Sequence, residues 1–536
     1  MDTFDYVIVG AGAAGSLLAA RLSENSNARV CLLEAGPPDV HPLLHLPAGF
    51  IKMLENEKYT WQFEAEPAAQ TNGRAILLPQ GRTLGGSTAI NGMVYNRGQR
   101  EDYDDWEALG NPGWNFDSVL PHFRRSEAFL GDGDDQFRGR DGELFVTTND
   151  WIHPLTEAFL QGAGELGIHG NRDYNGASQA GAGYYQRMIH RGRRVSASRA
   201  FLRPAVSRRN LDIRTNAQVT RILSEGGTAT GVEYLHGDRA PTTTVRARKE
   251  VIVCAGAINT PKLLQLSGFG PAELLRDLGI PVVRDLPGVG ANLRDHFAVR
   301  VVAKARNVTT INELARPPRL WWEAVKWALG RPSVLAVCPS IVHFHWRSDG
   351  TCGRPDLQGV FSPASYRAGK VGMLDRYPGM SCGFWLHRPA SSGSVSLRSI
   401  DPLQSPKVEA GYLTHAADCE GMLRGLRLAR RLLATRALAP YFEAETLPGS
   451  LVQSDDELLD YIRQVGASSY HLNGTARMGP ASDRFAVVDA SLRVHGVGAL
   501  RIADASVFPA IPSANICAAT FMVAEKAASL VLSESA

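Results

Sequence analysis

The stretch DYVIVGAGAAGSLLAARLSENSNARVCLLE, residues 5–34, decides the fold class of this chain. Its first apolar run, Asp5–Val9, predicts a short buried strand, and the alanine- and leucine-rich run after Gly15 predicts a helix. A second apolar run, Val30–Leu33, predicts another strand. Two strands joined by a helix crossover form a parallel β-α-β unit, so the chain opens as an α/β protein.

Glycines at three positions mark the turn between the first strand and the helix. Gly10 permits the tight turn, Gly12 lets a pyrophosphate approach the backbone, and Gly15 lets the helix pack closely on the strand. The helix N-terminus offers free N–H groups and a positive dipole end to phosphates. Glu34, which ends the second strand, can accept hydrogen bonds from ribose hydroxyls. The pattern predicts a dinucleotide site that disfavours NADP, and it does not separate FAD from NAD.

The composition is that of a globular protein, because 44% of the 536 residues are hydrophobic and 21% are charged. A disordered or collagen-like chain is therefore excluded. At roughly 150 residues per domain, the length allows two to four domain-sized units. The formal net charge of +3 is too balanced to indicate a nucleic-acid partner. The 53 glycines exceed the usual ~7%, which indicates tight turns and close contacts between backbone and ligand.

Seven cysteines are spread along the chain without a CxxC pair or a Cys/His cluster. This spacing predicts free thiols in a reducing compartment and no metal site. The first residues lack a basic n-region and enter a strand pattern at once, and no apolar run approaches the length of a membrane span. We therefore expect a cytoplasmic protein with no integral membrane segment.

Two further strand-to-helix units resemble the N-terminal one. Glu250–Ala255 predicts a buried strand that runs into a helix after Gly256, and Ala499–Ala503 predicts a strand followed by a helix over Ile516–Leu532. The simplest assembly is one nucleotide-binding domain built from the start, middle and end of the chain. The stretches between them, with strand-like runs and an Arg-rich helix, predict a second sheet-and-helix domain inserted twice. The predicted division is 1–155, 203–298 and 465–536 for the first domain, and 156–202 and 299–464 for the second.

Several other motifs follow the glycines of 10–15 in a fixed order. They are GRTLGGSTAIN at 81–91, GAINTP at 256–261, GVGANLRDH at 288–296, YHLNGTARMG at 470–479 and PSANICAATFM at 512–522. The set resembles the glucose–methanol–choline (GMC) oxidoreductases, in particular their branch of choline and alcohol dehydrogenases and aryl-alcohol and hydroxymethylfurfural oxidases. The resemblance covers nearly the whole chain, and Phe269 is a conservative departure, since the family has an aliphatic residue there.

The resemblance implies a fold, a cofactor and an activity. The fold is a Rossmann-like FAD-binding domain with an inserted α+β substrate-binding domain that contains an antiparallel sheet. The activity is the FAD-dependent oxidation of a primary alcohol to the aldehyde. By the resemblance, His471 is the base that takes the hydroxyl proton, flavin N5 takes the hydride, and Asn515 holds the substrate oxygen. An imidazole suits this role because its ordinary pKa lies near neutral pH.

The resemblance also assigns residues to the cofactor. Relatives with covalent flavin carry a histidine at the position matched by Ile90, and isoleucine cannot form that bond, so non-covalent FAD is expected. No metal is implied. The cofactor-binding residues implied are Gly10, Gly12, Ala13, Ala14, Gly15, Glu34, Ala35, Arg82, Gly85, Gly86, Ser87, Asn91, Gly92, Met93, Val94, Val219, Ala255, Gly256, Asp504, Ala505, Asn515 and Ile516.

The motifs leave the substrate and the electron acceptor open. Aryl, furanic, aliphatic and amino alcohols remain possible, and the acceptor is O2 or a quinone-type compound. A choline-type cation would need an aromatic cage or a carboxylate, and nothing in the sequence places Glu323 or Asp375 near the substrate. The alternative function is a hydroxynitrile lyase-type or other non-redox reaction on the same FAD scaffold. His296 and His495 are expected to be structural. Core packing is the first expectation for the aromatic candidates Trp61, Tyr95, Phe344, Trp346, Phe384 and Trp385.

Overall fold

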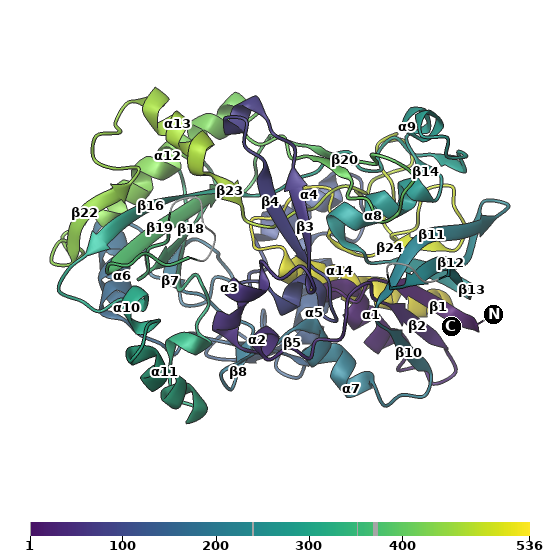
Figure 1. Cartoon of the computed structure of the whole chain (residues 1–536), viewed down its shortest axis with the longest axis horizontal. Helices are drawn as coiled ribbons and strands as arrows, with labels where there is room; N and C mark the ends of the chain where they lie inside the picture. The colour runs from purple at the N-terminus through teal and green to yellow at the C-terminus, as the bar shows by residue number, and fades with distance from the viewer. Residues whose placement is uncertain (1, 238–240, 351, 368–372, 536) are drawn as a thin grey trace.

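Two seven-stranded sheets lie at opposite ends of the molecule, and a two-stranded hairpin lies between them (Figure 1). This computed structural model describes residues 2–237, 241–350, 352–367 and 373–535. The hairpin pairs β3 (Thr60–Ala65) with β4 (Ile76–Gly81). The fold is of the mixed α/β class that the sequence predicts.

The first sheet is mainly parallel and contains the predicted N-terminal unit. Strand β1 pairs in parallel with β2 and β13, and β24 pairs in parallel with β13. The carboxyl ends of these four strands therefore meet at one edge of the sheet, where ligands of open α/β sheets bind. The strands, in sheet order, are β10 (Leu211–Arg214), β2 (Val30–Leu33), β1 (Asp2–Val9), β13 (Thr243–Val253), β12 (Thr228–His236) and β11 (Ala217–Glu225), with β24 (Leu500–Ile502) beside β13.

Strand β1 begins three residues before the predicted strand because Asp2, Thr3 and Phe4 pair with Val245–Ala247 of β13. The shift in register between Phe4 and Tyr6 joins this segment to the apolar one. This pairing joins segments that are distant in the sequence, so no local pattern indicates it. The sequence therefore predicted only the apolar part of β1, Asp5–Val9.

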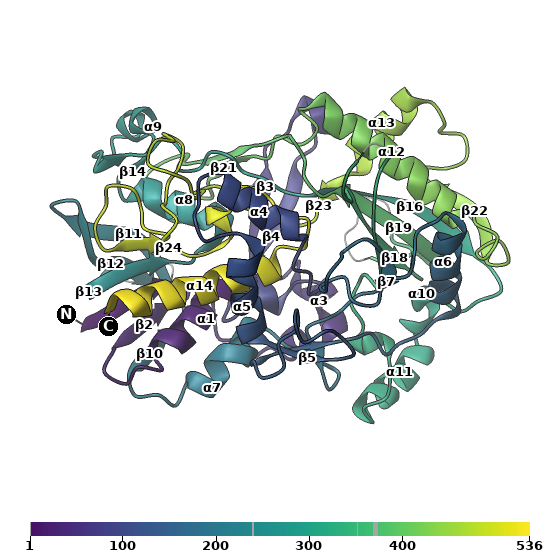
Figure 2. The same ribbon diagram turned by 180° about the vertical axis from the view of Figure 1, so that it is seen from behind.

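Helices from both ends of the chain cover this sheet side by side. Helix α14 (Cys517–Ser535) lies along α1 (Ala13–Leu22) in both views (Figures 1 and 2). A buried ion pair joins them, with Arg21 Nη2 2.7 Å from Glu525 Oε1. On the other side, α8 (Gly256–Leu266) starts directly after β13. The first and last helices of the described chain thus belong to one layer.

The second sheet is antiparallel, and its two faces differ. Helix α12 (Ala416–Leu433) packs against one face, where Phe384 of β19 meets Gly425. Because side chains alternate along a strand, Ser381, Gly383 and Trp385 point to the opposite face. The strands, in sheet order, are β22 (Phe442–Leu447), β16 (Phe297–Ala305), β19 (Gly379–Leu386), β18 (Leu357–Ser362), β17 (Val342–Trp346) and β7 (Gly181–Tyr184), with β23 (Ala467–Ser468) beside β16.

No helix in the described part of the chain is long and apolar enough to cross a membrane. Within the same residues, no group of three or more His, Cys, Asp or Glu side chains is arranged to hold a metal ion. All seven cysteines carry free thiols, and four of them are buried.

Candidate active site

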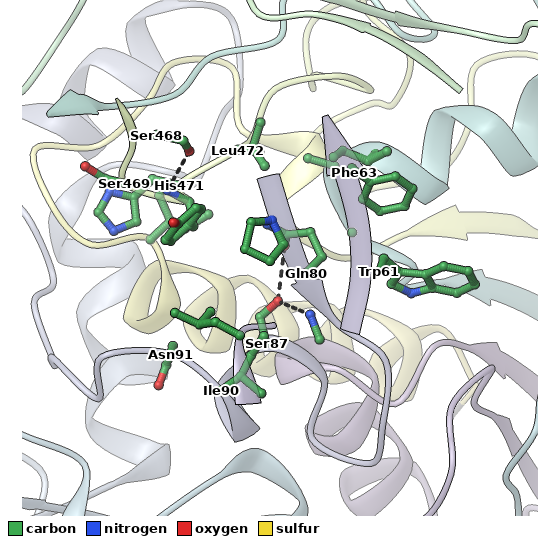
Figure 3. Close-up of a pocket in the computed structure, with 18 of the residues that line it drawn as sticks. Trp61, Phe63, Gln80, Ser87, Ile90, Asn91, Ser468, Ser469, His471 and Leu472 are labelled. Atoms are coloured by element: carbon green, nitrogen blue, oxygen red, sulfur yellow. Dashed lines mark hydrogen bonds between the residues drawn. The ribbon is translucent and has the colours of Figure 1, made fainter. Parts of the chain in front are cut away.

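A cavity of ≈630 Å³ separates the two sheets. The carboxyl ends of β1, β2, β13 and β24 form one wall, and residues of β16, β18 and β19 form the opposite wall. Figure 3 shows part of its lining, with Ser87, Ile90 and Asn91 on one side, His471 on another, and Trp61 and Phe63 of β3 beside them. The cavity therefore joins the edge of the parallel sheet, where nucleotides bind, to a face of the antiparallel sheet.

Glycines form the part of the wall that lies at the end of β1. A Cβ atom added to Gly86 would lie 2.7 Å from Gly12 Cα, so the two glycine loops touch each other. A Cβ at Gly12 or Gly256, by contrast, would meet no protein atom within 4 Å. Gly12 and Gly256 both line the cavity. This open backbone cradle at the start of α1 and α8 fits a pyrophosphate.

Two carboxylates stand at the strand ends beside this cradle. Glu34 accepts hydrogen bonds from the backbone N–H groups of Ala11, at 2.8 Å, and Gly36, at 2.9 Å. Burial raises the pKa of Glu34 to about 7, and those two bonds oppose the rise. Asp504 accepts hydrogen bonds from Gly256 N, at 2.8 Å, and Thr260 Oγ1, at 2.6 Å. Both carboxylates line the cavity and keep lone pairs that could accept ligand hydroxyls.

Most of the predicted cofactor-binding residues line this cavity, and three do not. A Cβ at Gly15 would lie 1.8 Å from Gly10 O, so this glycine permits the close packing of helix on strand. The Arg82 guanidinium lies over the Trp61 ring, 4.6 Å from its centroid, and Gly85 N donates to Ala11 O at 2.8 Å. The predicted residues that line it are Gly10, Gly12, Ala13, Ala14, Glu34, Ala35, Gly86, Ser87, Asn91, Gly92, Met93, Val94, Val219, Ala255, Gly256, Asp504, Ala505, Asn515 and Ile516.

His471 and Asn515 meet at the wall of the cavity. The distance from His471 Nε2 to Asn515 Nδ2 is 3.1 Å. Gln358 of β18 donates from Nε2 to Asn515 Oδ1 at 2.9 Å, which directs the Asn515 amide NH2 toward His471. A donor at this place requires an acceptor on the imidazole. His471 Nε2 therefore carries a lone pair that faces Asn515.

The other nitrogen of His471 is held by His296. The two Nδ1 atoms are 2.9 Å apart, and His296 Nε2 is 2.8 Å from the backbone oxygen of His387. A carbonyl oxygen only accepts, so His296 Nε2 carries the proton and its Nδ1 carries a lone pair. His471 Nδ1 must then donate to that lone pair. A backbone carbonyl two rings away thus fixes the tautomer in which His471 Nε2 is the basic nitrogen.

Burial keeps both imidazoles neutral. It lowers the pKa of His296 to about 4, and it lowers the pKa of His471 well below its ordinary value, with a further contribution from the neighbouring His296. Only 8% of His471 is exposed, and His296 is fully buried. The site therefore presents an uncharged proton acceptor to the cavity.

Asp295 holds the backbone around this pair. Its carboxylate accepts hydrogen bonds from the N–H groups of His296 and His471, both at 2.8 Å, and from the hydroxyls of Tyr412 and Ser468, both at 2.5 Å. Burial raises the pKa of Asp295 to about 6, against the effect of these hydrogen bonds. Asp295 thereby links its own segment, directly before β16, to Ser468 of β23, to the backbone of His471 and to Tyr412.

The sequence placed His471 and Asn515 in the site but missed the residues that orient them. His296 was expected to be structural, whereas the structure puts it in direct contact with His471. Asp295 and Gln358 were not singled out. For His296 and Asp295, the only signal in the sequence was the GVGANLRDH run at 288–296. Gln358 has no local signal, because only its position on the face of the second sheet brings it to Asn515.

The aromatic candidates divide between cavity and core. The Trp61 and Trp385 rings line the cavity, and the Trp385 ring lies 5.8 Å from the His471 ring, edge to face. Phe384 belongs to the lining as well, but its ring packs against Gly425 of α12 on the other face of the sheet. Tyr95 and Phe344 are buried in the interior instead, and Trp346 is half-buried against the core of the second sheet.

The charged residues of the lining are unevenly distributed. Glu34 and Asp504 are the only carboxylates among the cavity-lining residues that the structure describes, and both stand at the first sheet. Glu323 is buried elsewhere, where it accepts from Val334 N at 3.0 Å. The wall formed by the second sheet includes Arg300 and no described carboxylate.

Comparison with known proteins shows the family to which the chain belongs. Models of GMC oxidoreductases match residues 4–298 and 389–524. The oxygen-dependent choline dehydrogenase of Brucella anthropi is 40% identical over 533 residues, which cover 98% of this chain and 95% of that protein. The crystal structure of pyridoxine 4-oxidase from Mesorbium loti has a TM-score of 0.88 at 32% identity and 98% coverage of each chain. A structure concerned with FAD modification in the formate oxidase of Aspergillus oryzae RIB40 has a TM-score of 0.92 at 25% identity, covering 99% of this chain and 98% of the other.

Proposed function

Because the chain belongs to the GMC oxidoreductase family, we propose that His471 and Asn515 carry out the proton transfer of an FAD-dependent alcohol oxidation. The chain is an oxidoreductase that acts on CH–OH donors, and its substrate is a small-molecule alcohol. The observation that carries the assignment is the lone pair of His471 Nε2 at the cavity wall, 3.1 Å from the Asn515 amide.

The cavity fits FAD on its own geometry. The open cradle at Gly12 and Gly256 would hold the pyrophosphate, Glu34 would accept from ribose hydroxyls, and Asn91 and Ile516 would lie farther along the cofactor. FAD when bound supplies the hydride acceptor for the carbinol carbon. We propose that the other predicted cofactor residues that line the cavity contact FAD. Gly15, Arg82 and Gly85, which do not line it, are proposed to shape the site around the cofactor.

The residues of this chain supply the proton acceptor and the positioning. The alcohol hydroxyl replaces Asn515 as the donor to His471 Nε2, and the Asn515 amide donates to the alcohol oxygen. As the hydroxyl proton moves to Nε2, His471 becomes an imidazolium whose Nδ1–H still donates to the His296 lone pair. That lone pair stabilises the positive charge inside a buried site. Asn515 has no proton to accept, so its role is to orient the substrate.

We propose the predicted division into domains for this molecule. The FAD-binding domain comprises 1–155, 203–298 and 465–536, and the substrate-binding domain comprises 156–202 and 299–464. The two sheets support the division, since β7 of the first insertion pairs with β17 of the second. The free, mostly buried thiols support a reducing cytoplasmic location.

The electron acceptor is proposed to be O2 or a quinone-type compound. The names of the similar choline dehydrogenase, which is called oxygen-dependent, and of the two oxidases support O2. The lining supports no particular alcohol. A choline-type cation stays among the amino alcohols to be tested, because Trp61 and Trp385 of the lining can contribute to an aromatic cage. The wall formed by the second sheet has no described carboxylate that would bind the quaternary ammonium group as well.

The proposed function is tested by anaerobic mixing of the FAD-loaded protein with aryl, furanic, aliphatic and amino alcohols. Reduction by at least one alcohol, seen as loss of the visible absorbance of oxidised flavin, is the expected result. Adding O2 or a quinone afterwards should restore the absorbance and identify the acceptor. Release of cyanide from a hydroxynitrile without flavin reduction would instead establish the lyase alternative, which no observation here favours.

Non-covalent FAD is a second expectation. Ile90 lies in the cavity wall with an aliphatic side chain that cannot bond to the flavin. Acid precipitation of the holoenzyme is expected to leave the yellow flavin in the supernatant, as free FAD by chromatography. Flavin that stays with the pellet after washing would refute this.

A further inference from the structure

Helix α11 (Arg319–Ala328) turns its apolar side outward. Trp321 is 67% exposed, Trp322 62%, Val325 44%, and Leu329, directly after the helix, 66%. Positions 321, 325 and 329 recur every four residues, and Trp322 lies beside them, so these side chains form one stripe along the helix. Glu323 is the only buried residue of α11. An outward stripe with two tryptophans indicates an interaction surface.

Two segments rich in basic residues lie on the same side of the molecule as this stripe (Figures 1 and 2). Residues 189–209 contain seven arginines and no Asp or Glu, and residues 316–331 contain four basic residues and one acid, in a chain whose net charge is only +3. The two segments touch, since Trp327 Nε1 donates to Gly192 O at 2.8 Å. Arg194 is buried and binds Asn91, so it does not belong to the surface. The exposed members are Arg191, Arg193, Arg203, Arg209, Arg319 and Arg331.

Three acidic side chains next to these basic residues, Glu313, Asp39 and Glu323, each form an ion pair with one of them or with Lys326. Arg319 meets Glu313 at 3.3 Å, and Arg203 lies 3.6 Å from Asp39. Glu323 is buried and paired with Lys326. The surface therefore keeps a strong positive excess.

These segments lie along one edge of the molecule. Helices α11 and α7 (Arg203–Ala205) lie at the lower edge in both views (Figures 1 and 2), and Figure 1 shows β8 (Ile189–His190) between them. Val206, directly after α7, is 64% exposed and adds an apolar side chain. We call this surface the α11 face. It consists of α11, Leu329, Arg331 and the exposed residues of 189–209.

We propose that the α11 face docks on the surface of an anionic lipid bilayer. A helix with tryptophans on one side and basic residues beside them is typical of helices that lie in the membrane interface. Anionic head groups attract such clusters of basic residues. The tryptophans would enter the head-group region, and the arginines would contact the lipid phosphates.

The charge of the face decides against two other occupants. A second copy of this chain, joined about a two-fold axis, would bring two basic faces together, and like charges repel. A nucleic acid would be bound through its phosphates by the arginines and would leave the apolar stripe in water. A bilayer is the partner that uses both the charge and the stripe.

The experiment is flotation of the FAD-loaded protein with phosphatidylcholine vesicles that do or do not contain phosphatidylglycerol. We expect binding to the anionic vesicles only, weakened by high salt. Trp321→Ser/Trp322→Ser and, separately, Arg191→Glu/Arg209→Glu/Arg331→Glu should each lower the fraction bound at least tenfold. None of these residues lines the cavity, so flavin reduction by an alcohol should be unchanged. Leu451→Ser is the matched control, because Leu451 is 91% exposed but lies outside the α11 face.

Three results would overturn the proposal. The first is no binding of the unaltered protein to anionic vesicles, and the second is equal binding by the variants. The third is a different partner: a dimer in light scattering, or a complex with duplex DNA, that the same variants abolish while vesicle binding is absent. Unchanged flavin reduction and circular dichroism in the variants exclude misfolding as the cause of lost binding.

Discussion

Replacing His471 with alanine should slow flavin reduction by an alcohol by about 10²–10⁴-fold, the contribution of a positioned general base. FAD should remain bound, because the glycine cradle and Glu34 lie at the other sheet. Anaerobic stopped-flow absorbance gives the rate, and the flavin-to-protein ratio after gel filtration gives the occupancy. The control is His495→Ala, since His495 Nε2 bonds the backbone oxygen of Gly479 and His495 is not part of the cavity lining. A His471→Ala rate within a few fold of the unaltered enzyme would remove His471 as the base.

The pH dependence follows from the lowered pKa of His471. The neutral form accepts the proton, and burial favours that form. As the pH falls through 6.5, where an ordinary histidine becomes protonated, the unaltered enzyme should keep its rate. The rate should decline only at lower pH, and this acid limb should be missing from His471→Ala.

Replacing His296 with leucine should have the second largest effect. Leucine removes the acceptor of His471 Nδ1–H, which leaves a buried donor without a partner at a cost of about 1–3 kcal/mol, or roughly 5- to 150-fold in rate. It also frees His471 to adopt the tautomer whose proton sits on Nε2, where it cannot accept from the alcohol. The rate of flavin reduction should fall in that range, and the acid limb of the pH profile should move.

Three comparisons separate positioning from a loss of structure. His296→Gln restores a side-chain acceptor and should recover part of the rate. His343→Leu removes another fully buried histidine, one without a contact to His471, and should change the rate little. Nitrogen NMR of His471 should show the proton on Nδ1 in the unaltered protein and a mixture in His296→Leu. An unaltered rate in His296→Leu, or an equal loss in His343→Leu, would contradict the assignment.

The sequence was informative where one segment forms a feature by itself. Residues 5–34 form a strand, a turn and a helix within one segment, so the pattern predicted this unit and the part of the cradle that Gly12 provides. His471 and Asn515 were found through motifs. Local motifs did not reveal the roles of residues whose partners lie far away in the sequence.

Gln358 and His296 illustrate that limit. Gln358 reaches Asn515 because β18 pairs with β19 in a register that sets Gln358 opposite Trp385 on the cavity face. His296 orients His471 only because the backbone oxygen of His387 lies behind it. Both depend on strand register between distant segments, which no local pattern of residues contains.

The pairing of the chain's two ends has a consequence for biosynthesis. Strand β1 and helix α1 leave the ribosome first, yet Arg21 of α1 has its buried partner, Glu525, near the end of the chain. At about 5–20 residues per second, translation of this chain takes roughly half a minute to two minutes. During that time the apolar side of α1 that α14 covers in the finished protein lacks this cover. The cavity is complete only when residues 515–520 have emerged, so we expect flavin capture to belong to the last step of folding and to report that nearly the whole chain has been made.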